Sequence, residues 1–425
     1  MEQHADDLLA FASGAAVPEG FGYLDDAGAV LPARGTELWL TCRMTYAFAL
    51  GTLLGRPGCG PLVDHGIEAL RTRFEDEEYG GWFSAVGPDG PTNTAKEAYA
   101  HAFVMLAAAT ATLAGRPGAK DLLDRALAVS EGRFWSETEG MVLESWDRAF
   151  TTPEPYRGIN ANMHTVEAYL TVADVTGESM WRDRALRILE RTLTFARAHE
   201  WRLPEHFTPE WHPLLDYNSE DRAHPFRPYG ATVGHWFEWA RLALHARAAV
   251  LAHGGPAVRP VSGPPGQVPP AEEQTAWLLE GAVALFEAGV REGWAVDGAD
   301  GFVYTVDFAG EPVVRERMHW VVTEAVGAAA TLATTTGQAH YADWYARWWD
   351  YAHTHMIDGT GSWIHELDAQ NSPSATVWAG KPDVYHALQA TLLPRLPVWP
   401  TIGTALRAGQ LDQPARERAA ESRRR

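Results

Sequence analysis

A unit of two helices, repeated along the chain, constrains the fold more than any other feature of the sequence. Residues 39–54 are rich in apolar and small side chains and end at a Gly-Arg-Pro-Gly helix stop, and residues 60–74 form an amphipathic partner. A short aromatic, glycine-containing connector follows, and the same order then returns. The helix-ending residues Gly55, Gly115 and Gly177 lie about sixty residues apart, and the later intervals are longer because of insertions.

The two helices of each unit differ in polarity. Helices of the first type, such as 93–113, carry Ala, Gly and Thr with few charges, so we expect them to be buried on both sides. Helices of the second type, such as 179–198, have one face rich in Arg, Asp and Glu and should meet solvent there. Six buried helices that alternate with exposed ones predict an all-α fold, an (α/α)6 barrel with short β-hairpin connectors. An open α-solenoid is the alternative, but its inner helices would keep a more polar concave face.

We predict a single barrel domain over residues 1–400. The chain of 425 residues is 46% hydrophobic and contains 18 Trp, enough for a large core, and no segment resembles a linker between unlike compositions. A Pro/Gly-rich insertion at 256–270 interrupts the fourth unit, and its role does not follow from the sequence. Residues 401–425 are polar and rich in Ala and Arg, so we predict a flexible tail.

The acidic balance of the chain limits its partners. The net charge is −20 and the pI about 5.3, which argues against nucleic acid and anionic membranes. The first residues carry acids where a signal peptide would be basic, and no apolar run approaches the length of a membrane span. The two cysteines, Cys42 and Cys59, are too few for a disulfide framework and favour a reducing compartment. We therefore expect a soluble cytoplasmic protein, monomeric or homo-oligomeric.

Polar and aromatic side chains recur at the N-terminal turns of the first-type helices. In a closed barrel these turns meet around one mouth, so we expect the side chains to gather there. In the pairs that lie three or four residues apart, both side chains share one helix face. The candidates are Trp39 and Arg43, Tyr99, Asn160 and His164, His235 and Glu238, Trp320 and Glu324, and His386.

His235 and Glu238 form the most suggestive of these pairs. They lie three residues apart among tryptophans, and an imidazole beside a carboxylate can transfer protons. The candidates also have structural interpretations: Asn160 can cap its helix, the arginine can serve in an ion pair, and the aromatics can belong to the core. His365 and Glu366, in the connector before the last helix, can lean over the mouth.

Aromatic faces with several hydrogen-bonding groups indicate a carbohydrate site. The sequence has no glycine-rich phosphate loop and no cluster of lysines, which argues against a nucleotide. Several histidines with Glu238 can ligate a metal, but neither His-Glu-x-x-His nor a Cys/His cluster is present, so we expect no metal and no cofactor. Two carboxylates across a pocket can be a glycosidase pair. Histidines suit reversible proton transfer near neutral pH better, because their ordinary pKa lies close to it.

Several segments resemble the N-acylglucosamine 2-epimerase superfamily, and within it the aldose–ketose isomerases, which include mannose and sulfoquinovose isomerases. They are NANMHTVEAYLTVADVTGE at 160–178, GHWFEWARL at 234–242, WVVTEA around Glu324, and GSWIHELD followed by GKPDVYHALQ. The resemblance extends from Trp39 to Pro394. It implies an (α/α)6 barrel and metal-independent interconversion of an aldose and its 2-ketose, by ring opening and proton transfer between C2 and C1 through a cis-enediol.

The resemblance also implies a role for each candidate. His386 would be the base that moves the proton between C1 and C2, and His235, oriented by Glu238, would act as acid and base in ring opening. Fixed polar groups would hold the sugar hydroxyls and polarise the developing enediolate, a task that suits a cation. These groups would be Arg43, Asn160, His164 and Glu324. Trp39, Tyr99 and Trp320 would line the sugar site, joined by Arg227 just ahead of the central helix.

Two departures from the family pattern bear on the substrate. Sulfoquinovose isomerases tend to carry Gln four residues before the last histidine, where it helps hold the sulfonate, and this chain has Pro382 there. Arg43 is left as the obvious anion partner, which favours an uncharged hexose, hence D-mannose and D-fructose, with lyxose and xylulose as a side activity. Tyr46 stands where many relatives have histidine, and we assign it no role. The alternatives are sulfoquinovose isomerase, a 2-epimerase of cellobiose or N-acylglucosamine type, an (α/α)6 glycoside hydrolase, and a non-catalytic sugar-binding or protein-binding barrel.

Overall fold

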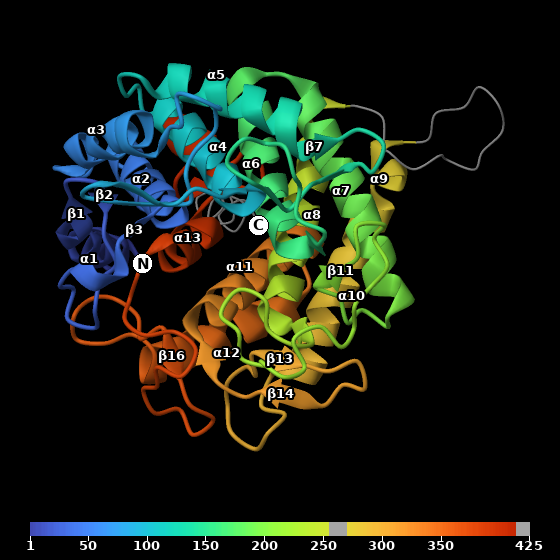
Figure 1. The fold of residues 1–425 in the computed structure, drawn as a ribbon. Helices are drawn as coiled ribbons and strands as arrows, with labels where there is room; N and C mark the ends of the chain where they lie inside the picture. Colours follow the sequence, from blue (N-terminus) through green and yellow to red (C-terminus); the bar gives the residue numbers. More distant parts are fainter. Residues whose placement is uncertain (255–269, 414–425) are drawn as a thin grey trace.

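Within residues 1–254 and 270–413, which the computed structural model describes, six helices surround the centre of the molecule (Figure 1). They contact one another in chain order, and the last contacts the first, so the ring is closed. The predicted (α/α)6 barrel is therefore confirmed. The inner helices are α2 (Leu38–Leu53), α4 (Ala98–Leu113), α6 (Ile159–Thr176), α8 (Val233–His253), α11 (His319–Thr336) and α13 (Tyr385–Leu392).

A second ring of helices covers the inner one. Its predicted members are α3 (Cys59–Ala69), α5 (Ala119–Val129), α7 (Ser179–Ala198), α10 (Ala276–Gly293) and α12 (Ala339–His355). The helix α1 (Glu2–Ala12) joins them, although it was not among the predicted helices. It contacts α13 and buries Ala5, Leu8, Leu9 and Ala12, whose spacing of three and four places them on one face. The N-terminus thus supplies the outer partner of the last inner helix.

The two rings differ in burial as their sequences predicted. Nearly every residue of α4 from Ala98 to Ala111 is buried, because small Ala and Thr side chains let neighbours approach on both sides. By contrast, α5 buries Ala119, Leu122 and Ala126 along one stripe and leaves its charged face in solvent. Most of the apolar core therefore lies around and between the two rings of helices.

Each of the first five inner helices starts from a two-residue strand that pairs antiparallel with a connector further along the chain. The pairs are β3 (Thr36–Glu37) with β4 (Ala85–Gly87), β6 (Lys96–Glu97) with β9 (Ser145–Trp146), β10 (Arg157–Gly158) with β11 (His206–Phe207), β12 (Ala231–Thr232) with β13 (Thr305–Val306), and β15 (Arg317–Met318) with β16 (Glu366–Leu367). The first residue of each helix donates its N–H to the residue before the connector strand. These accepting residues are Ser84, Glu144, Glu205, Tyr304 and His365. The repeated register aligns the five helix starts around one mouth.

The remaining short elements lie in the connectors and at helix ends. The strands are β1 (Ala16–Val17), β2 (Gly20–Phe21), β5 (Gly90–Asn93), β7 (Trp135–Ser136), β8 (Met141–Val142) and β14 (Pro312–Val314). The helical turns are η1 (Ser13–Ala15), η2 (Pro32–Arg34), η3 (Leu70–Phe74), η4 (Ser130–Phe134), α9 (Ala271–Gln274) and η5 (Leu393–Arg395). No helix in the described residues combines the length and the apolar character needed to cross a membrane.

The predicted flexible tail from residue 401 is wrong for its first part, where α14 (Ile402–Arg407) forms. This helix contacts α2, α4 and α6 at their C-terminal ends, opposite the mouth. Ile402 and Leu406, four residues apart, are buried on one face, a pattern that the polar composition of the whole segment concealed. Residues 414–425 of the predicted tail and 256–269 of the insertion lie outside the described residues.

Candidate active site

A pocket lies at the mouth of the barrel, where the inner helices begin, and encloses about 710 Å³ of space, part of it open to solvent. In the described part of the chain, its wall brings together nine of the residues predicted from sequence. They are Trp39, Arg43, Tyr99, Asn160, His164, His235, Glu238, Trp320 and His386. The wall is completed by Pro225, Phe226, Pro228, Tyr304, His319, His365, Trp378, Pro382 and Asp383.

The shared register of the helix starts explains why these side chains meet. The second residues of α2, α4, α6 and α11 are Trp39, Tyr99, Asn160 and Trp320, and the sixth residues of α2, α6, α8 and α11 are Arg43, His164, Glu238 and Glu324. At its second position α8 has Gly234 instead. A Cβ there would lie 2.3 Å from Cζ3 of Trp320, so the glycine leaves room for the indole. The Trp320 ring contacts both His235 and His386, with centroids 5.2 and 5.8 Å away.

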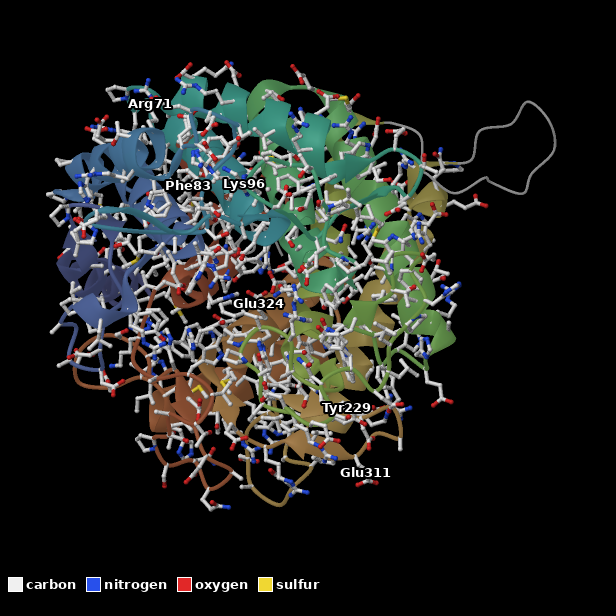
Figure 2. The ribbon with its side chains drawn as sticks, viewed as in Figure 1. Arg71, Phe83, Lys96, Tyr229, Glu311 and Glu324 are labelled. Atoms are coloured by element: carbon white, nitrogen blue, oxygen red, sulfur yellow. The ribbon has the colours of Figure 1, made fainter. Side chains whose placement is uncertain are left out.

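His386 stands at the start of α13 and is only 6% exposed. Its Nδ1 lies 2.9 Å from Oε1 of Glu324, a contact that assigns the Nδ1–H tautomer and leaves Nε2 as a free base. Burial and then Arg43 hold the pKa of His386 well below its ordinary value, so the ring is uncharged at neutral pH. Glu324 was predicted to hold sugar hydroxyls, but it lies behind His386 and outside the pocket wall, at the centre of the ring in Figure 2.

His235 has a different partner from the one predicted. Its Nδ1 lies 2.9 Å from Oε2 of Glu205, whose other oxygen accepts the N–H of Thr232. Glu205 supports His235 from the connector before β11, whereas Glu238 lies one helical turn deeper, so the predicted His235–Glu238 pair is wrong. Glu205 occupies the place that His365 occupies before β16. An alignment of the connectors with one another is the sequence signal that would have found it.

Glu238 instead forms part of the pocket floor. It is 0% exposed, and neither carboxyl oxygen has a hydrogen-bond partner among the described residues. Nδ1 of His164 lies 3.7 Å from Oε1 of Glu238, and Nη2 of Arg241 lies 3.6 Å from the same atom. Burial, and then the nearby Glu324, raise the pKa of Glu238 well above its ordinary value. The carboxyl group therefore keeps its proton to higher pH than an ordinary glutamate, and in the protonated form it can donate an O–H to a ligand.

His164 and Asn160 complete this polar floor. Burial lowers the pKa of His164 to about 4, so its ring is uncharged at neutral pH. The Nδ1 of His164 and the Oδ1 of Asn160 are buried and have no hydrogen-bond partner within the part of the chain that the structure describes. Asn160 does not cap its helix, because the N-cap of α6 is Gly158. Such unpaired polar atoms can be satisfied by the hydroxyls of a sugar.

Arg43 is held in place by a carboxylate and several aromatic rings. Its Nη1 lies 3.2 Å from Asp383, and its Nη2 donates to the hydroxyl of Tyr99 at 3.0 Å. Its guanidinium also lies 4.5 Å from the ring centre of Phe103 and 4.7 Å from that of Tyr385. Asp383 balances the charge of Arg43, so Arg43 is not the free anion partner that the sequence indicated. Asp383, in the motif GKPDVYH, was not predicted, because no residue near it in the sequence indicates that Arg43 is its partner.

A stacked pair of histidines, His319 and His365, forms another part of the wall. Their ring centroids lie 3.7 Å apart at an interplanar angle of 20°. Burial lowers the pKa of His319 to about 4 and that of His365 well below its ordinary value, so both rings are uncharged at neutral pH. Of the pair weighed from sequence, His365 lies in the wall. Glu366 accepts hydrogen bonds from the loop that carries Trp378.

Comparison with known proteins places the chain in a family. The model of the N-acylglucosamine 2-epimerase family matches residues 20–390. The chain belongs to this family. It is 51% identical to a D-mannose isomerase of Thermobifida fusca, over 96% of each chain, and 48% identical to one of Pseudomonas cannabina pv. alisalensis, over 94% of this chain and 92% of that one. A crystal structure of a D-mannose isomerase superposes with a TM-score of 0.80 at 28% identity, over 92% of this chain and 95% of that one.

Arg227, like Glu324, was predicted from the family resemblance and lies outside this pocket. Arg227 pairs with both carboxylate oxygens of Glu154, at 2.7 and 3.0 Å, and stacks on Tyr156. It lines a second hollow, which adjoins the pocket and shares with it Trp39, Tyr99, Asn160 and Phe226. This ion pair holds the side chain of Arg227 in the neighbouring hollow, and its place in the sugar site stays a prediction.

Two groups of side chains in this family member lie close enough to share a metal ion, as judged within the described residues. They are His164 with Glu167 and Glu238, and Glu238 with Glu324 and His386. Arg241 lies within 4.0 Å of all three carboxyl groups. A metal ion there would meet the repulsion of a buried guanidinium that already supplies a positive charge. The expected independence from metal stays a prediction, and a chelator can test it.

Proposed function

We propose that the protein is an aldose–ketose isomerase that interconverts D-mannose and D-fructose. The two D-mannose isomerases that match it over nearly their whole length support this reaction. The observation that carries the mechanism is the pair of histidines that contact Trp320, each with a carboxylate oxygen 2.9 Å from its Nδ1. Two such groups in one pocket can move protons at two places on a small sugar.

His386 is the proposed base of the isomerisation step. Its Nε2 takes the proton from C2 of the open-chain aldose, the C2–H electrons form the C1=C2 double bond, and the carbonyl oxygen on C1 takes up the proton that His235 holds after ring opening. The product of this step is the cis-enediol. Return of the proton from Nε2 to C1, with transfer of the C2 hydroxyl proton to the carboxylate that Glu238 has become in ring opening, gives the 2-ketose. Glu324, at Nδ1, stabilises the imidazolium that exists between the two transfers.

His235 and Glu238 are the proposed groups for ring opening. A pyranose opens when the anomeric hydroxyl loses its proton and the ring oxygen gains one. The Nε2 of His235 can take the first proton, because Glu205 fixes the opposite side of the imidazole. The protonated carboxyl group of Glu238, in the floor of the same pocket, can supply the second. The two groups can carry out these separate proton transfers without forming a hydrogen bond to each other.

The charge of the pocket favours an uncharged hexose. Among the described residues of its wall, Arg43 is the one permanent cation, and Asp383 already lies 3.2 Å from it. A sulfonate would have to compete with that carboxylate for the guanidinium, with Pro382 offering no side-chain donor. An enediolate needs less stabilisation from the guanidinium than a sulfonate does. Its partial charge can be stabilised by Arg43 together with the neutral donors of the floor.

We further propose that this reaction needs no metal ion or cofactor and takes place in the cytoplasm. The acidic charge of the chain and the presence of only two cysteines support the location. The electrostatic argument from Arg241 supports metal independence. The single domain ending near residue 400 and the oligomeric state, monomer or homo-oligomer, stay predictions from sequence.

Proton NMR of the purified protein with D-mannose in D2O tests the reaction. We expect fructose, part of it carrying deuterium at C1, because a proton held on an imidazole can exchange with solvent while the enediol lasts. Formation of glucose in place of fructose would identify a 2-epimerase. If mannose were unchanged and sulfoquinovose or a β-1,4-linked disaccharide were converted, the proposed substrate would be wrong.

A further inference from the structure

Arg241 is a buried cation beneath the pocket that the proposed chemistry does not touch. It lies on α8 one turn below Glu238, is 1% exposed, and is not part of the pocket wall. Carboxyl groups from three inner helices surround it. Its Nε lies 2.9 Å from Glu324, its Nη2 lies 3.6 Å from Glu238, and its Nη1 lies 4.0 Å from Glu167.

One cation among three buried carboxyl groups cannot balance three negative charges. Full ionisation would leave an excess of two negative charges, and burial makes such an excess costly. The lowest-energy arrangement is the one in which the carboxyl group with the poorest hydrogen bonding keeps its proton. The contacts of the three groups therefore decide which of them is neutral.

Those contacts single out Glu238. Glu324 has the direct ion pair with Arg241 and accepts the Nδ1–H of His386. Glu167 accepts hydrogen bonds from the hydroxyl of Tyr385 and the amide of Gln389. Burial alone would raise the pKa of Glu167, but contacts with His164, Arg241 and Tyr385 outweigh it and hold the pKa at about 2. Since His164 is uncharged at neutral pH, Arg241 is the charge that keeps Glu167 ionised.

The other titratable groups around this cluster do not change that balance. They are Tyr46 on α2, His164 on α6, His245 on α8, Tyr385 and His386 on α13, and Arg43 at the pocket wall. Burial raises the pKa values of the two tyrosines and lowers those of the three histidines, so all five are uncharged at neutral pH. Arg43 is balanced by Asp383.

We propose that Arg241 is a positioning residue for the isomerisation: it holds Glu324 ionised behind His386 and leaves Glu238 protonated at the pocket floor. The inference rests on the proposed function for its catalytic meaning. An ionised Glu324 fixes the tautomer that makes Nε2 of His386 a base, and a neutral Glu238 is an acid. Arginine suits this task because its fork reaches several carboxyl groups in fixed directions, which a lysine ammonium cannot do.

Replacement of Arg241 by methionine and by lysine tests the proposal. For Arg241→Met we expect kcat to fall by about 100-fold while KM for D-mannose changes by less than about threefold, since the residue does not reach the pocket. The acid limb of the kcat profile should move to higher pH, because the cluster of buried carboxyl groups then loses the cation that favours its ionised form. Arg241→Lys should keep the wild-type limb and recover part of kcat.

A matched control separates this role from a structural one. Arg317 is also fully buried and pairs with Asp297 at 2.6 Å, but it lies in strand β15 and outside the pocket wall. We expect Arg317→Met to lower the thermal stability and to leave the pH profile where it is. The proposal is overturned if the profile of Arg241→Met superimposes on that of the wild type, whatever the loss of stability.

Infrared spectroscopy of ligand-free protein labelled with 13C-glutamate gives a readout that needs no substrate. We expect the difference between wild type and Glu238→Gln at pH 7 to contain the C=O band of a protonated carboxyl group. The subtraction also removes the contribution of Glu144, whose pKa burial raises to about 7. A difference spectrum with carboxylate bands only would overturn the proposal even if Arg241→Met failed to fold. If the C=O band of a protonated carboxyl group were present but the protein left mannose unchanged, the proposed reaction would be refuted. The proposed charge arrangement would still be supported.

Discussion

The two histidines of the pocket rest on the same contact in two different settings. His235 and His386 each have a glutamate oxygen 2.9 Å from Nδ1. Glu205, behind His235, comes from a connector at the mouth, and its other oxygen accepts a backbone N–H. Glu324, behind His386, comes from the interior of an inner helix, and its other oxygen pairs with Arg241. One carboxylate is therefore held by the backbone and the other by a buried ion pair.

This difference separates two demands of the proposed reaction. Ring opening needs a group near the entrance that exchanges protons with hydroxyls. Proton abstraction from carbon needs a fixed base that is uncharged at neutral pH and screened from water, because the C–H acid is weak and the intermediate is reactive. The deeper setting of Glu324 and Arg241 matches the second demand, which assigns the harder step to His386.

The most damaging change should be the loss of His386. We expect His386→Gln to lower kcat for mannose by about 10³- to 10⁴-fold, since the base of the carbon step is removed. His235→Gln should cost less, about 10²-fold, because sugars also open their rings without help. Steady-state assays with D-mannose measure both, and His340→Gln, an exposed histidine on α12, provides the control. Equal losses of kcat in the two variants would contradict the assignment of separate steps to His386 and His235.

Loss of the carboxylate behind His386 should likewise be more damaging than loss of the carboxylate behind His235. Glu324→Gln leaves Arg241 as a buried cation without its direct partner, and we expect a loss of about 3–5 kcal/mol of unfolding free energy together with a large drop in kcat. Glu205→Gln keeps a carbonyl acceptor for the mouth backbone and should cost about 1 kcal/mol. Chemical denaturation and kcat, measured on both variants, test the contrast. Glu205→Gln proving the more harmful change would reverse the comparison.

The neutral histidines of the floor should make stability depend on pH. The pKa of His164 is lowered to about 4 from 6.5, so the folded state binds fewer protons than the unfolded state between these values. Its contribution to unfolding free energy therefore begins to fall below pH 6.5 and is lost by about pH 4, at a cost of about 3 kcal/mol. Denaturant titrations of wild type and His164→Gln should show a flatter acid slope in the variant. Parallel slopes would mean that His164 is not held neutral.

The site also shows which features could be predicted from the sequence and which could not. The inner helices and their second and sixth residues follow from local patterns, namely helix stops and spacing. Glu205 and Asp383 were missed because their partners His235 and Arg43 lie 30 and 340 positions away in the chain. The spacing of His235 and Glu238 correctly indicated one face of α8. It could not indicate depth, because a helical turn rises about 5 Å and leaves the two side chains in different layers.

We expect the smallest effect from a chelator. This experiment tests only the interior carboxyl groups around Arg241, and not the pair of His235 and Glu205. Both groups that can share a metal contain Glu238, and the pair of His235 and Glu205 belongs to neither, within the described residues. A bound metal would require Glu238 to ionise beside Arg241 and would take Glu324 away from that cation, which undoes the support proposed for His386. We therefore expect kcat for mannose to be unchanged after prolonged dialysis against EDTA, with untreated protein as the control. If activity were lost and returned with a divalent ion, Arg241 would not be the cation that organises the floor.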